Sequence, residues 1–412
     1  MTEWMVGLAL FNVFSVLALF VPRASRRRRV PWLLFGVSLL ASELAWIWLP
    51  LQALLALVFS LGGALDATLG RLALYSLLLS WPVLGWCLHV ALRAGAPVET
   101  ALQSGLGEGH RDEVPEPLRR SWRGPARFED WRKPFRAPPP GVECLRNIPY
   151  GPHGVRQMLD IYRPRVIPPG GCPVLLQIHG GAWMIGDKAH QALPLMHLLA
   201  SKGWICVAAN YRLSPSIGFP VHLEDCKRAL CWIRTEGAAY GMDPRFVAVT
   251  GGSAGGHLAA LMGLTANRPE LQQDFPGVDT SVQACVSFYG VYDFLGRYQQ
   301  HPNAELVVQF LTHRVVHETP EQNPALWDLA SPVMQIHPDA PPFMLVHGTL
   351  DSLAAISDGQ LFAQRLRRES KSPVVFLELP GTEHGFDGLH SPRTEAVIDG
   401  VERFLDWTRS RA

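Results

Sequence analysis

The chain has 412 residues, enough for a large core and for more than one minimal domain. Its 37 basic and 36 acidic residues leave a formal net charge of +1, which excludes the strongly basic surface typical of a nucleic-acid-binding protein. The seven cysteines are scattered and form no C-x-x-C pair, so the sequence favours buried thiols over a disulfide framework or a zinc site. Charged residues make up only 18% of the chain, and this deficit lies in the first hundred residues.

Three apolar segments near the amino terminus predict membrane-spanning helices. They are Trp4–Val21, Val30–Leu65 and Leu72–Leu92. A spanning helix needs about 20 apolar residues, so the second segment is too long for one span. It fits two helices that meet near Pro50, or a re-entrant hairpin. We therefore expect an α-helical transmembrane region over residues 1–95, with three or four spans.

Two other interpretations of this region are less consistent with the sequence. A cleaved signal peptide normally has its basic residues before the apolar run, whereas here they follow it. A set of buried core helices would have to be apolar on all faces over three long segments.

Five arginines between the first two apolar segments set the expected orientation: Arg23, Arg26, Arg27, Arg28 and Arg29. Such a run should stay in the cytoplasm, which places the amino terminus outside. Four spans would then return the rest of the chain to the outside, and three would leave it in the cytoplasm. Glu43 lies inside the second segment, where we expect it near a helix end or protonated rather than in catalysis.

The character of the chain changes after Ala94. Residues 96–140 are rich in Pro, Gly, Arg and Glu, which predicts a solvated linker or part of a cap, with lipid headgroup contact as the alternative. Residues 141–412 alternate between short apolar runs and helical patterns, which predicts a three-layer α/β domain with a mostly parallel sheet. The predicted strands are Met158–Pro164, Pro173–Gly180, Trp204–Tyr211, Phe246–Gly251, Ala284–Gly290, Phe343–Gly348 and Val374–Leu379. Active sites of such folds lie beyond the carboxyl ends of the strands.

The stretch TGGSAGGHLAAL, residues 250–261, carries a candidate nucleophile. A predicted strand ends just before Ser253 and a helical pattern follows at once, so G-x-S-x-G has the strand–turn–helix context that it requires. In so tight a turn, side chains at Gly251 or Gly255 would collide with their neighbours. The turn exposes the hydroxyl of Ser253 and directs the N–H of Ala254 to the same point. A glycine-rich packing turn is the alternative.

Three further motifs follow other predicted strands. HGGAW can present the N–H groups of Gly180 and Gly181 to an oxyanion, because neither residue has a side chain that blocks approach. HGTLD places Asp351 just past a later strand, and GTEHGF places His384 in the loop after the last strand. The order serine, aspartate, histidine, each after a different strand, is the order expected of an α/β-hydrolase triad.

These motifs resemble the hormone-sensitive-lipase-like branch of the α/β-hydrolase esterases over residues 141–412. The matching stretches are HGGAW, NYRLSP, GGSAGG, HGTLD and EHGF. The resemblance implies an eight-stranded sheet flanked by helices, a helical cap and no cofactor. The sequence departs from the branch at Gly252, where Asp is frequent, at Ala182, where a third glycine is frequent, and at Ser352, where Pro often follows the acid. The last departure makes Asp358 a second candidate for the acid, although Asp351 follows its strand directly.

Together these features predict a membrane-bound carboxylesterase or lipase that cleaves apolar or lipid esters through Ser253 and an acyl-enzyme. An acyltransferase or peptidase with the same triad, and a non-catalytic binding module on a hydrolase scaffold, are the alternatives. The segment Leu295–Pro342 is expected to form part of a cap over the site. Residues near the strand ends are candidates for an acyl pocket: Trp183, Met184, Tyr289, Tyr292 and Phe294. The expected partners are an ester substrate and the membrane, with no metal and no nucleic acid.

Overall fold

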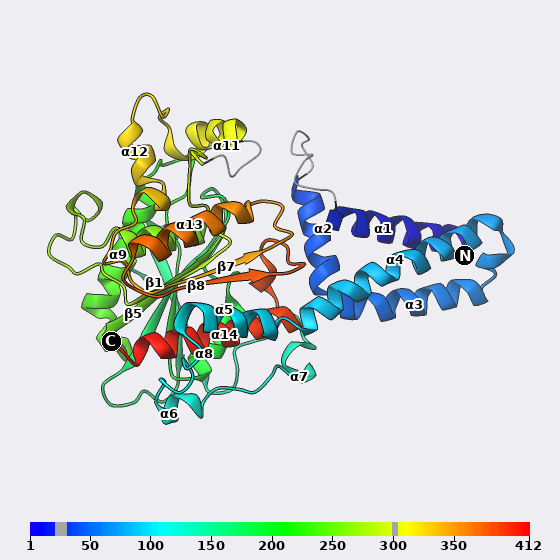
Figure 1. Cartoon of the computed structure of the whole chain (residues 1–412), viewed down its shortest axis with the longest axis horizontal. Coiled ribbons are helices and arrows are strands. Elements are labelled where there is room, and N and C mark those ends of the chain that lie inside the picture. The colour runs from blue at the N-terminus through cyan, green and yellow to red at the C-terminus, as the bar shows by residue number, and fades with distance from the viewer. Residues whose placement is uncertain (21–30, 299–303) are drawn as a thin grey trace.

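The computed structural model describes residues 1–20, 31–298 and 304–412 of the chain. They form a helical arm that projects from a rounded α/β body (Figure 1). The arm consists of α1 (Thr2–Phe20), α3 (Ala45–Leu61) and α4 (Thr68–Leu92), together with α2 (Pro31–Glu43), which lies across its inner end beside the body. The five arginines of the predicted cytoplasmic segment lie outside the described residues.

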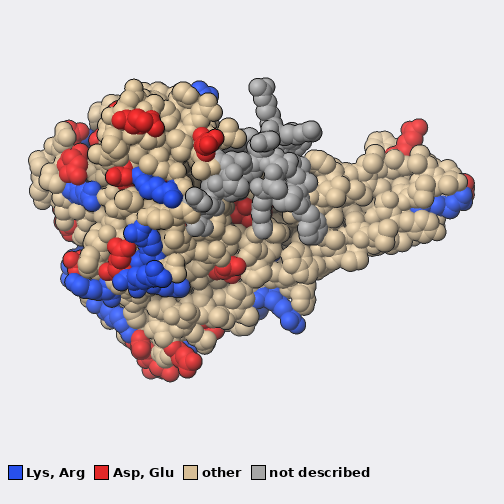
Figure 2. Space-filling view, turned by 45° about the horizontal axis from the view of Figure 1, so that its top comes forward, with Lys and Arg blue, Asp and Glu red and all other residues tan. Residues whose placement is uncertain are grey.

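Apolar side chains cover the outside of the arm. Leu54, Leu61 and Leu79 are 57%, 81% and 80% exposed, and few charged residues lie between the tip of the arm and the body on the face that Figure 2 shows. Helices with so much exposed apolar surface are not buried in a core, so the alternative prediction of a set of buried core helices is wrong. By length and composition, two described helices could cross a membrane, or three if α2 and α3 together count as one broken span.

Helices α2 and α3 meet at Leu44, not near Pro50 as expected. Pro50 lies inside α3, and the two helices are bent by 87° at the break. The 13 residues of α2 extend about 20 Å at 1.5 Å per residue, less than the roughly 30 Å of a bilayer core. The version with four spans is therefore not supported, because α2 is too short and lies across the arm.

The body is built on an eight-stranded sheet in the order β1-β2-β4-β3-β5-β6-β7-β8. The pairs β1–β2 and β2–β4 are antiparallel and the other pairs are parallel. The strands are β1 (Val142–Pro149), β2 (Met158–Pro164), β3 (Cys172–Ile178), β4 (Ile205–Ala209), β5 (Met242–Gly252), β6 (Ala284–Phe288), β7 (Phe343–Gly348) and β8 (Val374–Leu379). All seven predicted strands are present, and the mostly parallel eight-stranded sheet of the predicted fold class is confirmed.

Helices cover both faces of the sheet, which is why its central strands are continuously apolar. One face packs against α5 (Gly95–Leu106), α8 (Leu193–Ser201) and α14 (Pro392–Arg409). The other packs against α9 (Val221–Glu236), α10 (Ala254–Leu264) and α13 (Ile356–Glu369). Helix α5 belongs to the segment expected to be a linker or cap, yet its Val98 and Leu102 are buried in the body core, so this part of the expectation is wrong. The short α6 (Glu116–Arg119) and α7 (Phe128–Trp131) follow it.

The segment between β6 and β7 carries the remaining helices of the body. They are α11 (Ala304–Leu311), the π-helical turn Thr312–Val316 and α12 (Pro324–Leu329). Val307, Phe310 and Leu311 reach the pocket at the carboxyl edge of the sheet, as expected for part of a cap. Residues of the loop after β8 contact the arm, since a side chain at Gly381 would meet Trp86 of α4. The pocket therefore lies at the junction of body and arm.

Candidate active site

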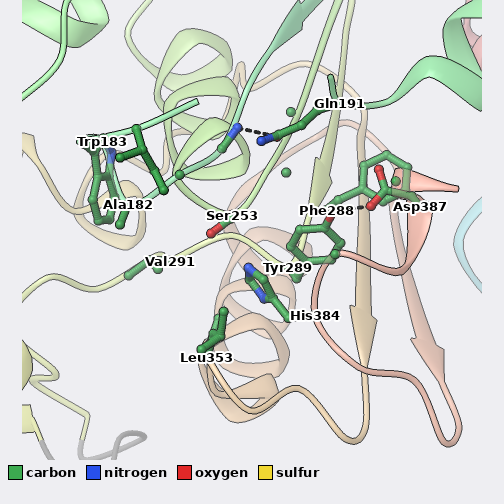
Figure 3. Close-up of a pocket in the computed structure, with 18 of the residues that line it drawn as sticks. Ala182, Trp183, Gln191, Ser253, Phe288, Tyr289, Val291, Leu353, His384 and Asp387 are labelled. Carbon is green, nitrogen blue, oxygen red and sulfur yellow. Dashed lines mark hydrogen bonds between the residues drawn. The ribbon is translucent and has the colours of Figure 1, made fainter. Parts of the chain in front are cut away.

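Ser253 occupies a strained turn between β5 and α10. Its backbone has φ 58° and ψ −122°, a conformation that a residue with a side chain rarely adopts. A Cβ at Gly251 would lie 2.4 Å from the carbonyl oxygen of Gly255, and one at Gly255 would lie 2.1 Å from that of Ile178. Both glycines are thus required for steric reasons. The turn presents Ser253 to a pocket, where its side chain lies beside the ring of His384 (Figure 3).

His384 is paired with Asp351 across two loops that follow β7 and β8. The Nδ1 of His384 lies 2.8 Å from Oδ2 of Asp351. The other carboxylate oxygen accepts the N–H groups of Leu353 and Ala354 at 2.9 and 2.7 Å, which fixes the carboxylate in place. The second candidate acid, Asp358, instead accepts the N–H of Tyr292 at 2.6 Å. The geometry therefore favours Asp351.

The two members of this pair change each other's proton affinity. Burial has the largest single effect and would lower the pKa of His384. The charge of Asp351 and its hydrogen bond, together with the charges of Glu383 and Asp387, outweigh burial and raise the pKa above its usual 6.5. Burial would raise the pKa of Asp351, but His384 and His347 hold it well below the usual 3.8. An ionised carboxylate beside the imidazole stabilises the protonated form of the base.

The loop after β3 places backbone N–H groups beside Ser253, but not all of those that were expected. The N–H of Gly180 donates to Oε1 of Gln191 at 2.6 Å and is thereby occupied. The next two residues, Gly181 and Ala182, have φ angles of 119° and 52° and line the pocket. Ala254 is the first residue of α10, where N–H groups have no acceptor within the helix. The N–H groups of Gly181, Ala182 and Ala254 are therefore the best placed to meet an oxyanion.

His257 follows Ser253 by one helical turn and supports the same loop from behind. Its Nδ1 accepts the indole N–H of Trp183 at 3.1 Å, and its Nε2 lies 2.8 Å from the carbonyl oxygen of Ala330. Burial lowers the pKa of His257 to about 4, so the ring is neutral at physiological pH. It holds Trp183, a residue with φ 61°, and does not face the pocket lumen as a base would.

The pocket has a volume of about 460 Å³ and largely apolar walls. Of the residues predicted to bind the acyl group, Trp183 and Tyr289 line it. Its other apolar walls are Phe35, Ile185, Phe288, Val291, Val307, Phe310, Leu311 and Leu353. This cavity can hold an apolar chain next to the hydroxyl of Ser253.

Three residues expected in the pocket lie elsewhere. Tyr292 is buried, stacks on Phe362 and shares a hydrogen bond of 2.8 Å with Ser287. Phe294 stacks on His257 behind the oxyanion loop. Met184 does not line the pocket, because the turn after Trp183 presents Ile185 instead.

The sequence did not single out several residues of this site. Phe35 comes from α2, and nothing in its apolar surroundings distinguishes it from its neighbours. Gln191 lies in an irregular loop, and only its contact with Gly180 reveals its role. Asp387 accepts a hydrogen bond from the hydroxyl of Tyr289 next to His384, and its place three residues after the histidine was the only available signal. Over residues 1–20, 31–298 and 304–412, no cluster of three or more His, Cys, Asp or Glu has the arrangement of a metal site.

Comparison with known proteins identifies the family. The family described as BD-FAE matches residues 159–366, about half of the chain. The probable carboxylic ester hydrolase LipM of Mycobacterium tuberculosis is 44% identical over 329 residues, which cover 76% of this chain and 72% of LipM. Esterase LipC of the same organism is 39% identical, over 69% of this chain and 72% of LipC. The solved structure of esterase B from Lactobacillus rhamnosis matches at 23% identity with a TM-score of 0.56, over 67% of this chain and 89% of that one, which shows the shared fold. The chain therefore belongs to the BD-FAE family of α/β-hydrolases, and it is a carboxylic ester hydrolase.

Proposed function

We propose that the protein is a membrane-bound serine esterase. In this proposal Ser253 is the nucleophile, His384 is the general base, and Asp351 is the carboxylate that orients the base. One observation carries this proposal: the strained Ser253 lies beside the imidazole that Asp351 binds at 2.8 Å, inside a largely apolar pocket. A nucleophile, a base and a residue that orients the base are the three parts that acyl transfer to serine requires.

In the first half of the reaction, His384 removes the proton of Ser253 as the hydroxyl oxygen attacks the ester carbonyl carbon. The N–H groups of Gly181, Ala182 and Ala254 stabilise the negative charge that develops on the carbonyl oxygen. Loss of one such donor typically lowers the rate by about 10²–10³. Asp351 holds the ring and stabilises the imidazolium that forms.

The intermediate then breaks the bond to the alcohol oxygen, which takes the proton of His384, and the alcohol departs to leave the acyl-enzyme. In the second half, water attacks the acyl carbonyl as His384 takes one of its protons; the acyl–oxygen bond then breaks, His384 returns the proton to the Ser253 oxygen, and the carboxylic acid is released. The apolar walls around Ser253 favour esters with apolar acyl groups. Lipid esters are such substrates, and the apolar outer surface of the arm would hold the protein at a membrane that contains them.

The arm suggests where the reaction takes place. We place α1, α3 and α4 in the bilayer and α2 along its surface, because α2 is short and bent away from α3. The body then lies on the same side of the membrane as the five arginines that follow α1, which is the cytoplasmic side.

The direct test is a Ser253→Ala variant of the full chain in detergent, assayed with p-nitrophenyl esters of increasing acyl length. We expect hydrolysis and labelling by a fluorophosphonate to disappear together, while the thermal unfolding midpoint remains near that of the wild type. Wild-type protein should favour esters of medium or long acyl chains over acetate. Retained turnover in Ser253→Ala would contradict the assignment of the nucleophile.

A further inference from the structure

Helix α2 of the arm touches the loop that carries His384. The hydroxyl of Ser38 donates to Oε2 of Glu383 at 2.8 Å, and both side chains are buried. One turn earlier, the ring of Phe35 meets the imidazole of His384 edge-on, with 6.1 Å between ring centroids. The arm therefore contacts the candidate base directly and also contacts the residue that precedes it.

The second oxygen of Glu383 connects the two loops of the His–Asp pair. Oε1 accepts the backbone N–H of His384 at 2.8 Å and the backbone N–H of Ser352 at 2.7 Å. Ser352 directly follows Asp351, so one carboxylate group fixes the main chain on both sides of the imidazole–carboxylate hydrogen bond. Since Ser38 binds the other oxygen, α2 restrains the orientation of this carboxylate.

A second buried contact anchors the same helix near its end. Glu43 forms an ion pair with Arg393, which is 0% exposed, and also accepts the hydroxyl of Ser391 at 2.7 Å. Arg393 in turn donates to the carbonyl oxygen of Gly381 at 3.2 Å, at the start of the loop that holds His384. Two charged groups of the body, Glu383 and Arg393, thus have buried partners on α2.

We propose that Glu383 is a positioning residue for the His384–Asp351 pair and that α2 holds Glu383 in place through Ser38, so that the arm is a working part of the active site. This inference rests on the proposed role of His384. In this proposal the arm does more than attach the protein to a membrane, because catalysis depends on the contact between α2 and the body.

The charge of Glu383 provides a readout that packing alone would not affect. The acidic groups that face His384 are Asp351, Glu383 and Asp387, and each favours the protonated imidazole; His347 faces Asp351 from β7, with 3.3 Å between its Nε2 and the carboxylate. The base must be neutral, so kcat/KM falls as the pH drops through the pKa of His384. Removal of one neighbouring negative charge lowers that pKa, and the acidic limb of the profile should move to lower pH.

Four variants of the full chain in lipid nanodiscs separate the effect of geometry from the effect of charge. Glu383→Gln retains a carbonyl oxygen for the two N–H groups and an amide that can face Ser38, so it should mainly shift the acidic limb to lower pH. Glu383→Ala removes the acceptor, and kcat should fall by about 10- to 100-fold with KM little changed, since a small misplacement of a catalytic group has effects of that size. Ser38→Ala should lower kcat by about 10-fold, and Ser38→Thr, which retains the hydroxyl, should restore most of it.

The matched control is Ser76→Ala on α4, whose hydroxyl bonds only to its own helix at Leu72 and which should behave as wild type. Wild-type protein and Ser253→Ala test the proposed function by themselves, so a failure there is distinguishable from a failure of this inference. If Ser38→Ala and Glu383→Ala retain the wild-type kcat, or if Glu383→Gln leaves the acidic limb where it was, the positioning role is overturned.

Discussion

Gly252, the residue just before the candidate nucleophile, is small because Tyr289 occupies the adjacent space. A Cβ at this position would lie 2.8 Å from the hydroxyl oxygen of Tyr289 and 2.9 Å from its ring. The centroid of the Tyr289 ring lies 4.3 Å from that of the His384 ring, and the hydroxyl of Tyr289 donates to Asp387. The departure from the frequent Asp at this position thus has a steric explanation: the Cβ of an aspartate would collide with Tyr289 where that ring now lies.

Substitution of Gly252 by Ala should therefore disturb the site through Tyr289. The added methyl group displaces the ring, and we expect the free energy of unfolding to fall by about 1–3 kcal/mol, as for other overpacked positions. Because Tyr289 packs on His384, kcat should fall as well. Thermal unfolding in detergent and ester hydrolysis measure the two effects. Gly124→Ala is the control, since its Cβ would meet nothing within 4 Å; equal behaviour of the two variants would contradict the explanation.

At the scale of elements, the sequence predicted what depends on local pattern. Strands that lie inside a sheet with both faces covered are mostly apolar runs, and the edge strand β8 is also largely apolar, so all seven of these strands could be found. Strand β1, at the opposite edge, has no such apolar run, because it includes Glu143, Arg146 and Asn147 and changes register between Leu145 and Ile148. The Gly and Pro residues of α5 are typical of loops and predict a linker or cap, whereas tertiary packing buries its Val98.

In the candidate site, too, features that depend on local sequence could be predicted, and features that depend on tertiary contacts could not. Ser253, Asp351 and His384 each follow a strand end, where sequence motifs carry the information, and the structure brings His384 together with both of the others. The acceptor of the Gly180 N–H and the contacts of α2 depend on residues far apart in the chain, and no local pattern encodes them. The break between α2 and α3 could not be placed either, because Pro50 is tolerated inside α3 while Glu43 binds the body.

Helix α2 also offers a prediction about substrate length. Phe35 forms part of the pocket wall, so Phe35→Ala should lengthen the cavity and favour longer acyl groups. We expect the ratio of kcat/KM for p-nitrophenyl octanoate over butyrate to rise by about 10-fold, the scale on which apolar pockets discriminate chain length. Phe14→Ala on α1, which is not part of the pocket, should leave the ratio unchanged. An unchanged ratio in Phe35→Ala would show that the acyl chain lies along another wall.

At the scale of the whole molecule, the chain passes along the arm three times. The amino terminus and the turn between α3 and α4 lie at the tip, while the end of α1 and the end of α4 lie beside the body (Figure 1). The end of α1 and the start of α2 both lie on the side of the body, and the sequence between these two helices contains five arginines. Arg71 lies at the tip, on the other side. Because basic residues are retained in the cytoplasm, we predict that the body lies on the cytoplasmic side.

Reporter fusions in a bacterial inner membrane test this orientation. Green fluorescent protein fused after Ala412 should fluoresce, and alkaline phosphatase at the same position should be inactive, because the former requires the cytoplasm and the latter the outside. Truncation after Gly63, between α3 and α4, should reverse both results. Active phosphatase after Ala412 would place the body outside and exclude three spans with cytoplasmic arginines. With the body in the cytoplasm, the pocket at the junction of body and arm would draw its esters from the inner leaflet, where α2 lies against the loop of His384.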